Sequence, residues 1–139
     1  MDSNECRKRA EQILRDLGCG EDAILSVTVV DSEAMAEINF NYRGKEGPTN
    51  VLSFSQSEAG ISSGNKDLLG DVVICSDRVV SDAETLGYTN EEMFMYLLIH
   101  GILHIVGYDH DSSDHAQAMG KAVDQIFEEF FPLTDTGLG

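Results

Sequence analysis

Three of the chain's four histidines stand in one short motif, His100-Gly-Ile-Leu-His104-Ile-Val-Gly107-Tyr-Asp-His110. Residues four apart lie one turn apart on the same face of an α-helix, so His100 and His104 can present two imidazoles to one ion. Gly107 permits a sharp turn out of the helix, after which His110 can fold back as a third ligand. Three imidazoles leave a fourth position open for water, which is typical of catalytic zinc. The spacing therefore predicts one Zn²⁺ per chain, which can lower the pKa of its bound water to about 7.

The histidines have two other interpretations. Core histidines in an apolar helix would not need this spacing or the glycine within it, so metal binding is favoured. The HxxxHxxxxxH pattern is also that of metzincin proteases, but those enzymes carry a glutamate general base directly after the first histidine. Gly101 stands there in this chain, which weakens a protease assignment. The fourth histidine, His115, lies among Asp and Ser residues and is interpreted as a solvated residue at a helix start.

The elements that must position the motif follow from hydrophobic periodicity and capping signals. Thr89 and Glu92 have the spacing of a capping box, which predicts a helix from about 91 to 106, and Asp111 or Ser112 caps a last helix to about 130. Further helices are expected at 3–17, from 31 or 32 to 42, and at 76–86, with strands at 23–30, 51–54 and 68–75. Residues 43–49 and 57–66 are predicted to be loops. The expected fold is α+β: a single domain over 1–139, with a small mixed sheet of three to four strands covered by helices and the metal site at a helix-turn.

Composition sets limits on partners and compartment. With 42% hydrophobic and 24% charged residues, the 139-residue chain is typical of a soluble globular domain. Its 25 acidic and 9 basic residues give a net charge of -16, which excludes nucleic-acid binding by bulk electrostatics, and DNA is not an expected partner. The three cysteines form no CxxC pair, which argues against disulfides and thiolate zinc. The longest apolar run, residues 93–106, is too short to cross a bilayer, which takes about 20 residues, so a cytoplasmic protein without a membrane partner is expected.

The motif around the histidines resembles the signature of the YbeY family, the bacterial ribosomal-RNA maturation factors. A second similar segment is Asn39-Phe-Asn-Tyr-Arg-Gly-Lys-Glu-Gly-Pro-Thr-Asn-Val-Leu-Ser-Phe54, and a third is Leu69-Gly-Asp-Val-Val-Ile-Cys75. The order and spacing of all three segments agree with the family over about residues 23–130. Two departures stand out, because Asn50 replaces the family's Asp and Ser55 replaces its Pro.

The resemblance implies a single-strand-specific, zinc-dependent endoribonuclease. Family members act in maturation of the small-subunit ribosomal RNA and in ribosome quality control, so the small subunit and its proteins are implied partners. The three motif histidines would be the zinc ligands. Arg43 falls on the family's arginine, which is placed near the metal.

The residues themselves allow roles beside the metal. The guanidinium of Arg43 can match two phosphate oxygens, although it could also be a solvated loop cation. It belongs to a group of bases in the middle third of the chain, Arg43, Lys45, Lys66 and Arg78, that could form a local RNA-binding groove. Asp109 could orient an imidazole or cap a turn. Asp71 could reach a ligand histidine or the loop carrying Arg43, or be an ordinary strand charge.

The sequence leaves two alternative functions open. One is a zinc hydrolase of another substrate class, such as a metzincin-like protease. The other is a non-catalytic ribosome-assembly factor with structural zinc, since the net charge of -16 favours partners with basic surfaces.

Overall fold

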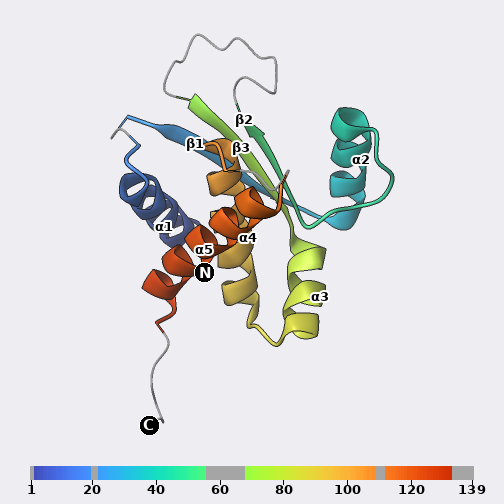
Figure 1. Cartoon of the computed structure of the whole chain (residues 1–139). Helices are drawn as coiled ribbons and strands as arrows, with labels where there is room; N and C mark the ends of the chain where they lie inside the picture. Colours follow the sequence, from blue (N-terminus) through green and yellow to red (C-terminus); the bar gives the residue numbers. More distant parts are fainter. Residues whose placement is uncertain (1, 20–21, 56–67, 109–111, 133–139) are drawn as a thin grey trace.

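The computed structural model describes residues 2–19, 22–55, 68–108 and 112–132 (Figure 1). In chain order the elements are α1 (Ser3–Asp16), β1 (Ile24–Val30), α2 (Ser32–Arg43), β2 (Val51–Ser55), β3 (Leu68–Cys75), α3 (Ser76–Leu86), α4 (Asn90–Ile105) and α5 (Ser113–Phe130). Among these residues no helix is both long enough and apolar enough to span a membrane.

The described strands form one sheet in the order β1-β3-β2. β1 runs parallel to β3, whereas β2 pairs antiparallel with it, from Val51 opposite Ile74 to Ser55 opposite Gly70. The expected α+β fold with a small mixed sheet is therefore confirmed. β3 lies in the centre, and β1 and β2 are the outer strands.

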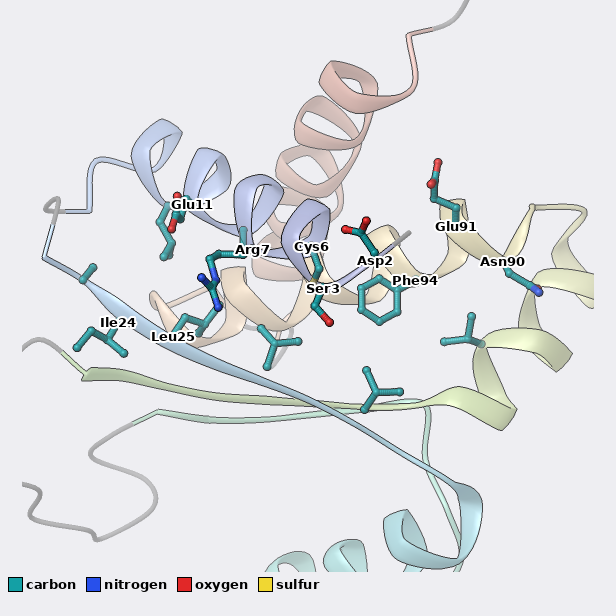
Figure 2. A pocket seen from close by; sticks show the side chains of 16 residues that line it. Asp2, Ser3, Cys6, Arg7, Glu11, Ile24, Leu25, Asn90, Glu91 and Phe94 are labelled. Atoms are coloured by element: carbon teal, nitrogen blue, oxygen red, sulfur yellow. The ribbon is translucent and has the colours of Figure 1, made fainter.

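Helices cover the two faces of the sheet unequally. Successive residues of a strand point to opposite faces, and β3 follows this rule. Val72 and Ile74 join a core with α1, α3, α4 and α5, whereas Val73 and Cys75 pack with Met35 of α2 on the other face. α1 lies over the β1 side of the sheet (Figure 2).

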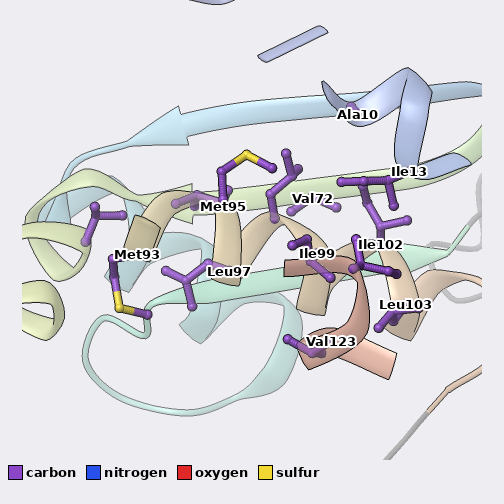
Figure 3. Close-up of a cluster of buried hydrophobic side chains, with 14 of the residues drawn as sticks. Ala10, Ile13, Val72, Met93, Met95, Leu97, Ile99, Ile102, Leu103 and Val123 are labelled. Carbon is purple, nitrogen blue, oxygen red and sulfur yellow. The ribbon is translucent and has the colours of Figure 1, made fainter. Parts of the chain in front are cut away.

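The larger core is built around α4. Eight of its residues are buried: Met93, Met95, Leu97, Leu98, Ile99, Gly101, Ile102 and Leu103. Figure 3 shows several of these side chains between the sheet and α1 and α5. The predicted capping box is present, since Thr89 Oγ1 accepts from Glu92 N at 3.0 Å and Glu92 Oε1 accepts from Thr89 N at 2.8 Å. The helix that carries the histidine motif is therefore held firmly at its start and along its length.

Two helix starts resolve the alternatives that the sequence left open, and one helix end differs from the expectation. Asp31 caps α2, because its Oδ1 accepts from Ala34 N at 2.9 Å, and Ser112 caps α5. α2 extends to Arg43 rather than ending at Tyr42. Gly44 takes a left-handed φ of 68° and its N–H bonds the carbonyl of Phe40, which completes one more residue of helix. The predicted loop at 57–66 lies outside the described residues.

Candidate metal centre and RNA-binding residues

α4 carries both His100 and His104 in its C-terminal half. Both histidines are partly exposed, while the neighbouring Ile99, Ile102 and Leu103 are fully buried. The two histidines thus lie where the core meets the surface, one helical turn apart, as the spacing predicts. An ion and a substrate can reach side chains placed in this way.

The third predicted ligand, His110, and its neighbour Asp109 lie outside the described residues. Within the described ranges, no three His, Cys, Asp or Glu side chains gather as a metal-holding group. The structure therefore brings two of the three predicted ligands onto one helix, and the complete ligand set remains a prediction. His115 is exposed in the first turn of α5, as expected for a helix-start residue.

Gly107 makes the turn that the motif requires. Its φ is 115°, a value that residues with a Cβ rarely adopt. The turn is closed by backbone hydrogen bonds from Gly107 N to His104 O at 3.2 Å and from Tyr108 N to Leu103 O at 3.0 Å. The expected positive φ is therefore confirmed.

We expect Gly107→Val to lower stability by about 1–3 kcal/mol, because a β-branched residue is strained at this φ. It should also bind zinc poorly without loss of any ligand. Thermal melts and metal analysis measure both effects. Gly120→Val is the matched control, since Gly120 is exposed within α5 with open space beside it, and valine is better than glycine in a helix. If both variants melted alike, the turn at Gly107 would be ordinary.

Gly101 allows α4 to lie directly on the sheet. A Cβ at this position would stand 2.8 Å from Val72 Cγ1 and 3.0 Å from Ser53 Oγ. Ser53 Oγ also donates a hydrogen bond to the Gly101 carbonyl at 3.1 Å. The position at which a metzincin carries its glutamate thus faces the sheet and has no room for a side chain.

Gly101→Ala should lower the melting temperature although alanine is the better helix former. Overpacking a core costs about 1–3 kcal/mol, and Val72 is a buried, stiff β-branched neighbour, so the clash should exceed the helix-propensity gain of about 1 kcal/mol. Gly120→Ala has the same propensity gain without the clash and should raise the melting temperature. A rise of similar size in both variants would show that α4 can shift away from the sheet without cost.

Arg43 lies in the last turn of α2 and is exposed. It forms no ion pair with another residue that the structure describes. Its surroundings are anchored: the Tyr42 ring lies 5.2 Å from the Phe54 ring of β2, and the buried Asn39 donates from Nδ2 to Gly47 O at 2.9 Å. Arg43 therefore extends from a fixed helix end, and not from the loop that the sequence suggested.

The other bases of the middle third differ in their surroundings. Arg78 has structural partners, since its Nε lies 3.5 Å from Asp82 Oδ1 and its Nη1 donates to Pro48 O at 3.4 Å. Lys66 lies outside the described residues. Lys45 is exposed just beyond α2, so Arg43 and Lys45 are the exposed members among the described ones.

Asp71 stands opposite Phe54 in the antiparallel pair of β2 and β3. Strand alternation places it on the same face as Val73 and Cys75, which pack against α2. α4, the helix that carries the histidines, covers the other face. This placement favours a role for Asp71 toward the segment that carries Arg43 over a role as partner of a histidine.

Several motif residues have structural roles that sequence reasoning missed. Asn50, where the family has Asp, donates to Asp82 of α3 at 3.1 Å, and its carbonyl accepts from Cys75 N at 2.9 Å. Asn39 and Ser53 likewise tie the motif loop and β2 to their neighbours. Ser53, a polar residue within the apolar run 51–54, was the available signal among them.

Comparison with known proteins settles which family these features belong to. The family model described as "YbeY: Endoribonuclease YbeY" matches residues 1–131. The chain belongs to the YbeY family. Endoribonuclease YbeY of Syntrophus aciditrophicus is 40% identical over 129 residues, covering 91% of this chain and 80% of that protein. Endoribonuclease YbeY of Geobacter sulfurreducens is 40% identical over 131 residues, covering 94% and 85% respectively.

The fold agrees with this YbeY assignment. The solution structure of TM1509 from Thermotoga maritima superposes with a TM-score of 0.59 at 25% identity, covering 96% of this chain and 86% of that one. The name shared by the YbeY relatives specifies an endoribonuclease, that is, a hydrolase of RNA. Neither the protease nor the non-catalytic assembly factor gains support from these comparisons.

Proposed function

We propose that this YbeY-family chain is a zinc-dependent endoribonuclease that cleaves single-stranded RNA in maturation of the small-subunit ribosomal RNA and in ribosome quality control. The family match over residues 1–131 is the observation that carries the proposal. The paired histidines of α4 and the turn at Gly107 support it. The zinc chemistry in this proposal depends on the histidine motif that begins in α4.

One Zn²⁺ per chain is held, in this proposal, by His100, His104 and His110. Imidazole nitrogen is a donor that suits zinc, and the partly exposed positions on α4 fit an ion that substrate must reach. When bound, the zinc supplies Lewis-acid charge to a phosphoryl oxygen and activates water. The apolar core beneath α4 holds both helix ligands in place.

Arg43 binds the scissile phosphate in this scheme. Cleavage of RNA builds negative charge on the phosphoryl oxygens, and a guanidinium can hold two of them with parallel hydrogen bonds. With a net charge of -16, the rest of the chain repels RNA, so an exposed arginine at a fixed helix end matters more here than in a basic protein. Lys45 adds positive charge beside it.

The two acidic candidates have different parts in the proposal. Asp71, on the sheet face that α2 covers, would help to orient the segment that carries Arg43. Asp109, adjacent in sequence to His110, would accept a hydrogen bond from an imidazole and fix its ring.

The proposed place of action is the cytoplasm, on ribosomal RNA of the small subunit. The acidic surface is suited to contact with basic ribosomal proteins, since opposite charges raise association rates.

Cleavage assays with metal-defined protein test the proposed function. A labelled RNA should be cut internally when single-stranded and be resistant when annealed to its complement. Removing the metal with a chelator should abolish cleavage, and adding zinc should restore it. Equal cleavage of the duplex, or full activity in chelator, would contradict the proposal.

A further inference from the structure

A groove runs along the outer strand β1, at the edge of the sheet opposite to β2. α1 lies above it and β1 below, and the starts of α4 and α3 close one end (Figure 2). The cavity has a volume of about 780 Å³. Among the described strands none pairs with the outer edge of β1. The groove is therefore bounded on one side by a strand edge.

The floor of the groove is apolar. Val29 is 51% exposed and Ile24 is 44% exposed, although both belong to a strand of the sheet. Large apolar side chains along a sheet edge are a surface to which another strand can add. The apolar residues that line the groove come from four elements: Leu14 of α1, Leu25, Val27 and Val29 of β1, Val79 of α3 and Phe94 of α4.

The rim of the groove is mainly acidic. Asp2 borders it at the start of α1, and Glu11 borders it along α1. Glu91 borders it at the start of α4, 3.8 Å from Arg9, and Arg7 is the base among the lining residues. The whole chain adds a net charge of -16. These charges repel a phosphate backbone and favour an occupant that carries Lys or Arg.

From this geometry we propose that the groove binds an extended, basic peptide segment of another protein, which adds to β1 as a further strand. A segment as long as β1, seven residues, would span roughly 23 Å. Alternate apolar side chains of the segment would enter beneath α1, and the intervening Lys and Arg side chains would meet the acidic rim. Main-chain hydrogen bonds to the β1 edge would supply the remaining affinity. This proposal is independent of the ribonuclease activity.

A second copy of the chain is a poorer occupant. Edge-to-edge pairing of two β1 strands would bring two acidic rims together, each on a chain of net charge -16. The resulting repulsion opposes a homodimer through this face, whereas the same charges attract a basic segment.

The test measures binding of the peptide acetyl-Lys-Val-Arg-Val-Lys-Val-Arg-amide by isothermal titration calorimetry. A peptide with Pro in place of each Val keeps the charge but loses backbone donors and cannot extend the sheet, so it should bind at least 10-fold more weakly. An acidic peptide, with Glu in place of Lys and Arg, should not bind. Equal binding of the proline peptide would show attraction by charge alone and overturn the proposal, as would no binding of the first peptide.

Matched protein variants locate the binding. Val29→Glu should weaken binding at least 10-fold, whereas Val80→Glu, at an equally exposed valine of α3 outside the groove, should not. Glu11→Lys should weaken binding about two- to fivefold, while Glu37→Lys on the exposed surface of α2 makes the same charge change elsewhere. Equal effects within either pair would overturn the location.

Measurements of folding, amide exchange and oligomeric state keep the test decisive. Circular dichroism and thermal melts of Val29→Glu show whether the variant folds. If it does not, slowed amide exchange along residues 24–30 of the parent on addition of the peptide is the deciding result, and unchanged exchange there refutes strand addition. Sedimentation without peptide should show a monomer, and a dimer that Val29→Glu dissociates would make a second copy the occupant instead.

Discussion

Replacing His104 by alanine should remove the zinc and the ribonuclease activity together while the fold remains. Loss of groups that merely support a ligand costs about 10- to 100-fold in metal affinity, so loss of a ligand itself should cost more. The fold should survive because the core beneath α4 consists of apolar residues, and His104 is only partly buried. Metal analysis, RNA cleavage and thermal melts on one preparation measure all three effects.

The controls for His104→Ala separate metal loss from unfolding. The variant should melt at the temperature of the parent stripped of its metal, because both then lack the same stabilising ligand. His115→Ala, at an exposed histidine of α5, should keep its zinc and its activity. Zinc binding by the parent should also weaken at acidic pH, because protons compete for imidazole nitrogens. Full zinc retention by His104→Ala would refute the assignment.

Arg43→Ala should lose RNA cleavage by about 100-fold or more while keeping its zinc and melting close to the parent. Removing one preorganised donor to developing negative charge typically costs about 10²–10³ in rate. Arg43 is exposed and has no ion pair with another described residue, so little stability depends on it. The measurement is single-turnover cleavage of a single-stranded RNA beside melting curves.

Two substitutions sharpen the result for Arg43. Arg43→Lys should restore activity only in part, because an ammonium cannot reproduce paired hydrogen bonds to phosphate. Arg15→Ala is the matched control, since Arg15 is likewise an exposed arginine in the last turn of a helix, α1. It should leave cleavage unchanged. Unchanged cleavage by Arg43→Ala would refute the phosphate role, and a large drop in its melting temperature would instead make Arg43 structural, through Asp71 or another partner.

Local sequence signals determined most of the elements of this protein. The largely apolar segment 68–75, with β-branched residues at 72–74, predicted β3, and the following segment 76–86 predicted α3, both with the observed bounds. Thr89 and Glu92 predicted the start of α4 through a hydrogen-bonding pattern that spans only three residues. The sequence also predicted that His100 and His104 lie one turn apart on one helix and that Gly107 has a positive φ. Both features depend only on residues that are near each other in the chain.

Other features depended on contacts between residues far apart in the sequence, and only the tertiary structure decided them. The packing of α2 against Val73 and Cys75 places Asp71, on the same side of β3, on the face that α2 covers and not on the face that α4 covers. In the sequence Asn50 stands out only as a departure from the family pattern, whereas in the structure its amide donates a hydrogen bond to Asp82, 32 residues later. The need for glycine at position 101 arises from Val72 and Ser53. The groove beside β1 exists because three helices meet there at the outer edge of β1, with which no other described strand pairs. Periodicity and capping signals are local and can be identified in a sequence. These other features depend on which surfaces pack together when apolar area is buried, and that involves residues far apart in the chain.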